Sequence, residues 1–292
     1  MPKADEILVR IHASAVTSSD WFIRSAIPSF PLRIQLAMRL MVGITAPRKR
    51  ILGLILAGQV DEIGSSVTRF TVGERVYAFT KFHFGSYAQY TCLTESSTVA
   101  TAPANVTLEE AAAIPYGGLL ALHYLRKGGV GHGTAVLVYG ASGAVGSSAV
   151  QLARHLGGEV TAVCGPANLE LVRSLGASQV IDYTTESTLG IEQRYDLVFD
   201  AVGKRKSSSL KEAARTGLRP GGRFISVDDG TPDLPATDLA YLTRLVEAGE
   251  LQPVIDRRYR LDEIVEAHRY VEQEHKRGNV VITVAHVETS SG

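Results

Sequence analysis

The chain has 292 residues, of which 45% are hydrophobic and 21% charged, ordinary values for a globular protein of about two domains. Its 30 basic residues balance its 30 acidic ones, so it lacks the basic field of a nucleic-acid-binding protein. No apolar run approaches the ~18 residues of a membrane-spanning helix, and the polar start of the chain predicts no signal peptide. The two cysteines, Cys92 and Cys164, lack metal-ligand or redox-pair spacing. We therefore expect a cytoplasmic protein with reduced thiols that binds neither nucleic acid nor membrane.

Residues 1–104 have the pattern of a small β-domain. Alternating apolar side chains predict a half-buried strand at 7–13, and an apolar run predicts a buried strand within 51–64. Further strands are expected at 72–79 and 85–93. The segment Pro28–Met41 is apolar and helix-prone, and two interpretations stay open: a lid over a substrate, or a helix packed on the β-domain.

A helix is predicted at 108–125, next along the chain. Thr107 is a suitable N-cap, and Glu109 and Glu110 supply the acidic first turn that favours a helix start. Pro115 lies inside this segment, so we expect a break or kink there.

The most informative segment starts with an apolar, β-branched strand at 135–139 that stops at a glycine. Three glycines at three-residue spacing, Gly140, Gly143 and Gly146, lead into a helical pattern. Gly140 permits a tight turn, Gly143 lets a phosphate approach the backbone, and Gly146 lets helix and strand pack closely. The helix N-terminus would present N–H groups and partial positive charge to a pyrophosphate. The segment therefore predicts dinucleotide binding, with a purely structural glycine turn as the alternative.

Strands and helices alternate beyond the glycine turn. Strands are expected at 159–164, 179–183, 195–200 and 222–227. This alternation predicts right-handed βαβ units and a doubly wound parallel sheet within residues 105–250. A helix at 237–248, a strand at 253–259, an amphipathic segment at 261–274 and a last strand at 278–284 complete the chain.

The chain resembles the medium-chain dehydrogenase/reductase superfamily, in its zinc-independent quinone-oxidoreductase-like branch. The likeness is carried by spaced glycines and apolar residues over Ala57–Val76, by Gly85–Tyr90, by Ala111–Pro115, by Leu175–Ala177 with Val180–Tyr183, and by Ala267–Arg269 with Gly278–Val281. The resemblance implies a Rossmann cofactor domain and a GroES-like β-domain, with catalysis in the cleft between them. It assigns residues 1–104 to the first part of the GroES-like substrate domain, 105–250 to the Rossmann domain, and 251–292 to the segment that completes the substrate domain.

Two departures from the family pattern affect these expectations. Zinc-dependent relatives carry Cys near the position of Thr17 and His-Glu at the positions of Leu54 and Ile55. Hydrocarbon side chains cannot ligate a metal, so we expect no zinc. Family members also begin with a β-hairpin before the segment matching Glu6–Val9, whereas this chain starts almost at that strand. An unpaired edge is therefore expected in the β-domain.

The cofactor choice depends on the end of the second Rossmann strand. NAD-preferring domains place an Asp or Glu there, and this chain has Cys164 and Gly165. Without that carboxylate a 2′-phosphate is not repelled, so NADPH is expected and NADH is less favoured. Asn168, Arg173 and Tyr183 are candidates to surround that phosphate. The resemblance supports Tyr183 and, more weakly, Asn279 as a contact on the nicotinamide side. The residues expected to bind the cofactor are Gly140, Ser142, Gly143, Ala144, Val145, Gly146, Cys164, Gly165, Tyr183, Ala201, Val202, Ser226 and Asn279.

The expected activity is hydride transfer from NADPH to a quinone or an α,β-unsaturated carbonyl. Such acceptors spread the developing negative charge, so no metal or strong acid is required. The group that meets this charge is unknown; candidates are Thr17, Ser18, Ser19, Tyr77 and Tyr116. Asp20 is expected to hold its loop rather than to react. Two alternatives stay open: a reductase of simple aldehydes or ketones, and a weakly catalytic NADPH-binding sensor or structural protein. The expected partners are a small carbonyl or quinone substrate and, as one option, a second copy in a homodimer.

Overall fold

The computed structural model describes residues 1–25, 51–185, 194–203, 209–273 and 275–286. The segment Pro28–Met41, expected to be a lid or a packed helix, lies outside the described residues. The chain forms two compact units, Met1–Pro115 with Ile255–Gly292, and Tyr116–Val254. We call them the β-unit and the α/β-unit. The boundary predicted from the sequence is earlier, between residues 104 and 105. In the structure, helix α3 (Leu108–Ala112) packs against strands of the β-unit, and nothing in the local sequence indicates that packing.

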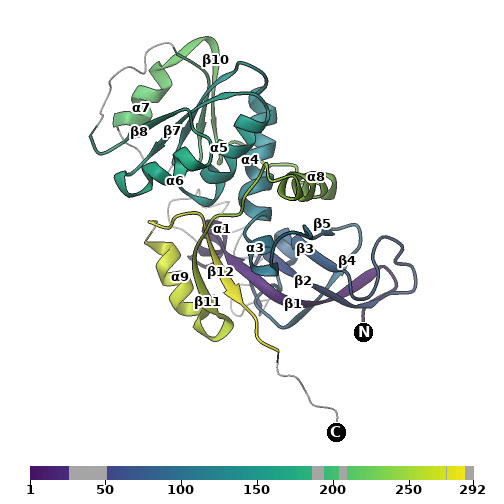
Figure 1. Ribbon diagram of the computed structural model, residues 1–292. Helices are drawn as coiled ribbons and strands as arrows, with labels where there is room; N and C mark the ends of the chain where they lie inside the picture. Colours follow the sequence, from purple (N-terminus) through teal and green to yellow (C-terminus); the bar gives the residue numbers. More distant parts are fainter. Residues whose placement is uncertain (26–50, 186–193, 204–208, 274, 287–292) are drawn as a thin grey trace. The chain divides into compact units, whose positions relative to one another are not determined.

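The β-unit is built on a seven-stranded sheet in the order β11-β12-β1-β2-β3-β5, with β4 also paired to β1 (Figure 1). Its strands are β1 (Glu6–Val16), β2 (Ile55–Ile63), β3 (Arg75–Phe79), β4 (Tyr90–Thr94), β5 (Val99–Thr101), β11 (Ile255–Arg260) and β12 (Asn279–Thr283). The returning C-terminal segment joins the sheet through β12, which runs antiparallel to the second half of β1.

The first strand of the chain is not an edge strand. One side of β1 pairs with β2, and its other side is shared by β4 and β12. The strands with one strand neighbour in the described sheet are β4, β5 and β11. The unpaired edge expected from the start of the chain is therefore not at β1.

Apolar side chains from both faces of this sheet form its core. One cluster includes Ile7, Val9 and Leu56, and a second, which includes Val16 and Val280, packs under the C-terminal helix. The helical elements of the β-unit are α1 (Ser18–Ser25), η1 (Lys81–His83), α3, η3 (Leu261–Glu263) and α9 (Ile264–Glu272). Thr107 caps α3 as expected, and Glu110 returns a bond to the Thr107 backbone.

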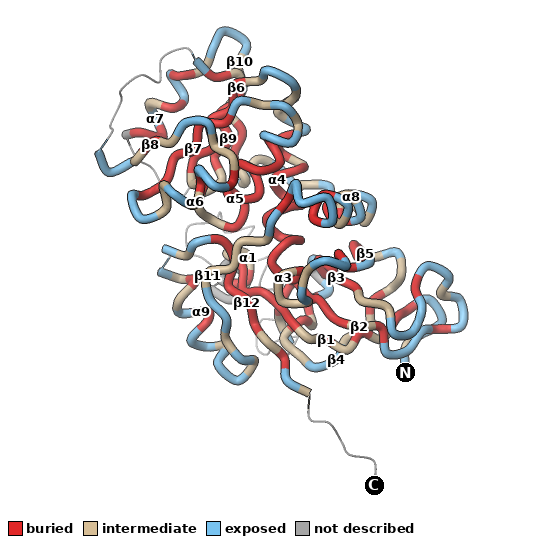
Figure 2. Tube along the Cα trace, viewed as in Figure 1, coloured by how far each residue is buried: buried red, intermediate tan, exposed pale blue. Residues whose placement is uncertain are grey.

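The α/β-unit contains a five-stranded, all-parallel sheet in the order β10-β9-β6-β7-β8. Its strands are β6 (Ala135–Tyr139), β7 (Glu159–Cys164), β8 (Gln179–Asp182), β9 (Tyr195–Asp200) and β10 (Leu218–Ser226). Its helices are α4 (Pro115–Gly128), α5 (Ala144–His155), η2 (Pro166–Asn168), α6 (Leu169–Ser174), α7 (Ser209–Thr216) and α8 (Ala236–Glu247). The central strands are buried along most of their length (Figure 2), as expected for a parallel sheet covered on both faces.

The strand order reverses at β6. The chain runs from β6 outward through β7 to β8, and then crosses to β9 on the other side of β6. Ligands of doubly wound sheets bind beyond the carboxyl ends of the strands at such a switch point. The fold therefore indicates that a ligand would bind at the loops after β6 and β9. None of the helices in the described ranges is both long and apolar enough to cross a membrane.

Candidate functional site

The glycine turn between β6 and α5 forms the centre of the candidate site. Gly140 has a φ of +78°, in the left-handed region that side-chain-bearing residues rarely adopt. The backbone N–H groups of Gly140 and Ala141 both donate to the Val163 carbonyl at 3.0 Å, so the turn is tied to β7. Gly140 therefore supplies the sharp turn expected of it.

Gly146 and Gly143 meet different constraints. A Cβ on Gly146 would lie 2.1 Å from the Gly140 carbonyl oxygen and 2.7 Å from the Ala141 Cα. Close packing of helix and strand therefore requires glycine at that position. A Cβ on Gly143 would have its nearest protein neighbour at 3.6 Å, an ordinary contact. The protein itself does not require glycine at 143, which leaves open space on that side of the turn.

The N-terminus of α5 faces this turn without a side-chain cap. Gly143 is the N-cap residue, and no acidic side chain lies in the first turn. The first N–H groups of an α-helix have no partner within the helix, and they carry its partial positive charge. Ala144, Val145 and Gly146 contribute these groups, and Ser142 precedes them in the turn. The arrangement suits a pyrophosphate.

The end of β7 carries no negative charge. Cys164 is 1% exposed, and burial raises the pKa of its thiol to about 11, so the group is neutral. The ring of Tyr183 lies against Gly165, with its hydroxyl 3.2 Å from where a Gly165 Cβ would be. Arg173 is near enough to favour the thiolate form of Cys164. This end of the sheet therefore combines a neutral thiol, a half-exposed phenol and a neighbouring guanidinium.

Asp182 is the nearest carboxylate and was not singled out in the sequence. It lies opposite Cys164 in the pairing of β7 with β8. One of its carboxylate oxygens already accepts bonds from the Thr184 backbone N–H (2.9 Å) and hydroxyl (2.8 Å). These bonds tie Asp182 to its own turn.

The turn after β9 packs against the glycine turn. Val202 reaches to within 2.3 Å of where a Gly140 Cβ would be, and the Ala201 N–H donates to the Tyr139 carbonyl. Ser226, at the end of β10, donates its hydroxyl to Asp200 at 3.1 Å. The predicted residues from β6, β9 and β10 therefore lie at the same edge of the parallel sheet.

Twelve of the thirteen predicted cofactor residues belong to the α/β-unit; Asn279 belongs to the β-unit. Asn279 is 4% exposed and begins β12 opposite Ile255. The sequence missed one functional candidate, Lys211, whose charged side chain is 5% exposed and pairs with Asp200 at 2.7 Å. A lysine within a short, otherwise amphipathic segment gives no sequence signal of burial.

The five side chains that are candidates for stabilising the negative charge formed after hydride transfer differ in their solvent exposure. Tyr77 is fully buried in β3, and Thr17 is 2% exposed with its hydroxyl donating to Asp20 at 2.6 Å. Ser18 and Ser19, at the start of α1, are partly exposed, and Tyr116, in the α/β-unit, is 9% exposed. Tyr77 and Thr17 are thus held in the interior of the β-unit.

Asp20 organises the loop that precedes α1. One carboxylate oxygen accepts from both the backbone N–H (2.8 Å) and the hydroxyl of Thr17. Burial raises the pKa of Asp20 to about 6, and the hydrogen bonds from Thr17 oppose that shift. The residue therefore holds its loop, in a setting where its charged form is disfavoured.

The positions that hold zinc in zinc-dependent relatives do not fit a metal here. Leu54 and Ile55 are 3% and 0% exposed and contribute only hydrocarbon, and the Thr17 hydroxyl is engaged with Asp20. Catalytic zinc requires three nitrogen, oxygen or sulfur ligands from the protein. Among the described residues, no group of three or more His, Cys, Asp or Glu side chains could hold a metal ion.

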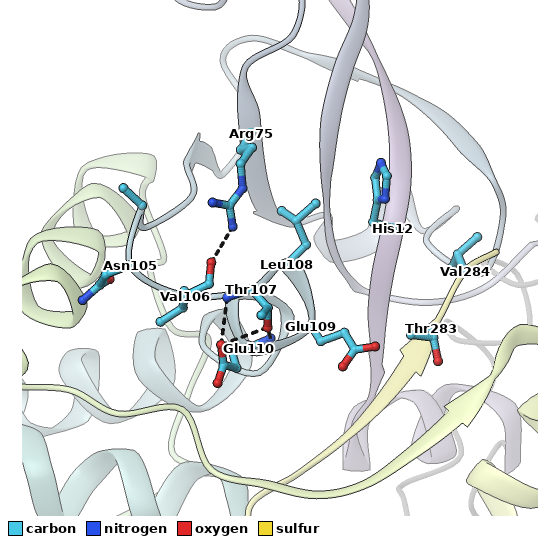
Figure 3. Close-up of a pocket in the computed structure, with 11 residues that line it drawn as sticks. His12, Arg75, Asn105, Val106, Thr107, Leu108, Glu109, Glu110, Thr283 and Val284 are labelled. Carbon is cyan, nitrogen blue, oxygen red and sulfur yellow. Dashed lines mark hydrogen bonds between the residues drawn. The ribbon is translucent and has the colours of Figure 1, made fainter. Parts of the chain in front are cut away.

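An open hollow of about 860 Å³ lies in the β-unit around the start of α3 (Figure 3). Several of its polar side chains are used in local structure: Glu110 and Thr107 form the cap, and Arg75 donates to the Val106 carbonyl at 2.5 Å. Glu109 pairs with Arg258 at 2.7 Å. These contacts explain the hollow as part of the β-unit's framework.

Comparison with known proteins agrees with this geometry. The sequence model for the alcohol dehydrogenase GroES-like domain matches residues 3–116, and two models described as zinc-binding dehydrogenase match residues 144–247 and 231–282. A 2-methylene-furan-3-one reductase of Solanum lycopersicum is 32% identical over 301 residues, which cover 96% of this chain and 72% of that protein. An NADPH-dependent alkenal/one oxidoreductase of Arabidopsis thaliana is 31% identical, with the same coverage.

Solved structures give the same result for the fold. The quinone oxidoreductase from Coxiella burnetii superposes with a TM-score of 0.80 at 26% identity, over 98% of this chain and 92% of that one. An NAD-dependent alcohol dehydrogenase superposes with a TM-score of 0.77 at 27% identity, over 98% and 93% of the two chains. With its Rossmann-type sheet, glycine turn and GroES-like β-unit, this chain belongs to the medium-chain dehydrogenase/reductase superfamily.

Proposed function

We propose that this protein transfers a hydride from NADPH to a quinone or an α,β-unsaturated carbonyl and that it does so without zinc. The observation that carries the proposal is the uncapped N-terminus of α5 at the sheet's switch point, beside the uncharged end of β7. The named relatives, an alkenal/one oxidoreductase and quinone oxidoreductases, support the same acceptor class.

The cofactor would be held by the carboxyl edge of the α/β-unit. The amides of the first turn of α5 suit the pyrophosphate, and the other predicted residues of the α/β-unit would line the rest of the cofactor. Asn279, in the β-unit, is proposed as a cofactor contact on the family resemblance alone. When bound, NADPH supplies the hydride. The neutral Cys164 thiol does not repel a 2′-phosphate, and Arg173 adds a positive charge nearby, while the Asp182 carboxylate is tied to its own turn by two hydrogen bonds. These features favour NADPH over NADH.

The class of hydride acceptor is proposed from positions 54 and 55 of the β-unit, which carry no metal-ligating side chains. With hydrocarbon at 54 and 55, the charge left after hydride addition must be met by hydrogen-bond donors or water. A conjugated acceptor spreads that charge over several atoms and needs the least help. Simple aldehydes and ketones concentrate it on one oxygen and are the less suited class.

The proposal is tested with purified protein, NADPH or NADH, and a panel of quinones, enones and simple aldehydes, followed by the loss of reduced-nicotinamide absorbance. We expect turnover of quinones or enones with NADPH, unchanged after dialysis against a metal chelator. Turnover of simple aldehydes alone would establish the carbonyl-reductase alternative. NADPH binding without turnover of any acceptor would favour a sensor, and loss of activity with the chelator would refute zinc independence.

The cofactor preference has its own test at Arg173. Arg173→Ala removes a guanidinium whose positive charge acts on Cys164 and should weaken NADPH binding about tenfold, ~1.4 kcal/mol, with NADH binding unchanged. Arg215→Ala is the matched control, because both arginines are about half exposed and each pairs with a glutamate three residues earlier. Equal weakening of NADPH and NADH by Arg173→Ala would contradict a role in recognising the 2′-phosphate.

A further inference from the structure

A buried ion pair lies directly behind the turn that follows β9. Asp200 is fully buried at the end of that strand, and the side chain of Lys211 on α7 is 5% exposed. The Lys211 Nζ lies 2.7 Å from the Asp200 Oδ2. Two charges removed from water in this way are costly unless each is hydrogen-bonded as well as paired.

Both charged side chains also bond the same three-residue turn, 201–203. The other oxygen of Asp200 accepts from the backbone N–H groups of Val202 and Gly203, each at 3.2 Å. Lys211 donates to the Gly203 carbonyl at 2.6 Å. The turn is therefore held from its amide side by Asp200 and from its carbonyl side by Lys211.

The conformation held in this way is an unusual one. Gly203 has a φ of +90°, and a Cβ there would lie 2.6 Å from a carboxylate oxygen of Asp228. Asp200 also accepts the Ser226 hydroxyl, which joins the end of β10 to the same carboxylate. The ends of β9 and β10 and the 201–203 turn thus form one hydrogen-bonded unit.

This turn contacts the glycine turn of the cofactor site. The Val202 side chain reaches to within 2.3 Å of where a Gly140 Cβ would be, and the Ala201 N–H bonds the end of β6. A shift of the 201–203 turn would therefore move the wall of the space beside Gly140. Binding sites require such walls to be fixed before the ligand arrives, because ordering them on binding costs affinity.

We infer that Lys211 is a positioning residue for the cofactor: through its bond to the Gly203 carbonyl it fixes the 201–203 turn that borders the glycine turn. This inference rests on the proposed nicotinamide-cofactor function. In this inference Lys211 does more than neutralise Asp200, because it also donates a hydrogen bond to the Gly203 carbonyl in the turn itself. Lys211 does not touch the reacting atoms in this account.

The decisive comparison is between Lys211→Met and the double variant Asp200→Asn/Lys211→Met. The single variant leaves a buried carboxylate without its cation, which destabilises the fold. The double variant removes both charges and keeps an amide oxygen able to accept from the Val202 and Gly203 N–H groups. If Lys211 only balanced charge, the double variant would bind NADPH as the wild type does.

We expect the double variant to raise the KM for NADPH about tenfold, equivalent to ~1.4 kcal/mol, with a much smaller change in kcat. Leu210→Ala is the matched control: Leu210 precedes Lys211 on α7, is 2% exposed and packs in the core of the same unit. It should lower the melting temperature without raising that KM. An unchanged KM in the double variant, or an equal rise in Leu210→Ala, would overturn the inference.

Amide hydrogen exchange separates this inference from the proposed function. In the protein without cofactor, the Val202 and Gly203 amides should exchange faster in the double variant than in the wild type and in Leu210→Ala. Unchanged protection would overturn the inference whether or not NADPH binds. A wild-type protein that binds neither NADPH nor NADH would refute the proposed function, and the exchange data would still decide whether Lys211 holds the turn.

Discussion

Replacing each of two glycines of the same turn by alanine should separate stability from cofactor binding. Gly146→Ala places a methyl group 2.1 Å from the Gly140 carbonyl oxygen, and ordinary contact starts at 3.4 Å. The backbone must therefore move by about 1.3 Å, and overpacking of this kind costs about 1–3 kcal/mol. Alanine has a higher helix propensity than glycine, which offsets up to ~1 kcal/mol of that cost.

Gly143→Ala introduces the same methyl group into open space. Its nearest protein atom would be at 3.6 Å, and φ at this position is −77°, which alanine adopts freely. Alanine is a poorer N-cap than glycine by roughly 0.5 kcal/mol, and the lower entropy of the unfolded chain offsets about that amount. The free energy of unfolding should therefore change by less than ~0.5 kcal/mol, while the methyl group blocks the approach of a phosphate to the turn.

The assay is thermal unfolding together with NADPH titration by fluorescence. For a unit of this size, ~2–4 °C per kcal/mol gives a loss of up to roughly 12 °C for Gly146→Ala, after the gain in helix propensity is subtracted, and almost none for Gly143→Ala. Gly143→Ala should nevertheless weaken NADPH binding at least about tenfold, ~1.4 kcal/mol. A Gly143→Ala protein that binds NADPH normally would refute the reasoning, as would one as unstable as Gly146→Ala.

Two further predictions concern the β-unit. Burial raises the pKa of Asp20 from 3.8 to about 6, so the folded state holds the Asp20 proton more tightly than the unfolded state does. The stability that the neutral carboxyl contributes is complete below pH 3.8 and is lost as the pH rises through 6. The melting temperature of Asp20→Asn relative to wild type should therefore rise between about pH 4 and pH 7, and a pH-independent difference would contradict the raised pKa. Thr107→Ala removes the cap of α3 and should cost about 1 kcal/mol in urea unfolding; Thr68→Ala, at an exposed position, is the control, and an equal loss there would argue against the cap.

The sequence predicted those elements whose causes are local. The strand–glycine–helix pattern at Gly140 defined β6, α5 and the turn between them, because tight turns and close packing act on neighbouring residues. The break at Pro115 is confirmed: α3 ends at Ala112, and α4 starts at Pro115 itself.

The features that the sequence did not predict depend on distant partners. The short strand β5, which pairs with β3, was not predicted. The strand β12 was predicted, as was the return of its segment to the β-domain, but its pairing with β1 depends on long-range contacts. Lys211 is the clearest case at the site: its burial depends on Asp200 and Gly203, and a lysine in a short helix is otherwise expected at the surface. The family resemblance supplied the identity of the fold, whereas these contacts required the structure.

Hydride transfer to the β-carbon of a conjugated ketone can be followed directly with a deuterium label. The protein would be incubated with an α,β-unsaturated ketone and NADPH deuterated at both C4 positions, and the product analysed by mass spectrometry and NMR. We predict one deuterium on the carbon β to the carbonyl and a saturated ketone product. Deuterium on the carbonyl carbon, with the double bond retained, would contradict the account and identify a simple carbonyl reductase.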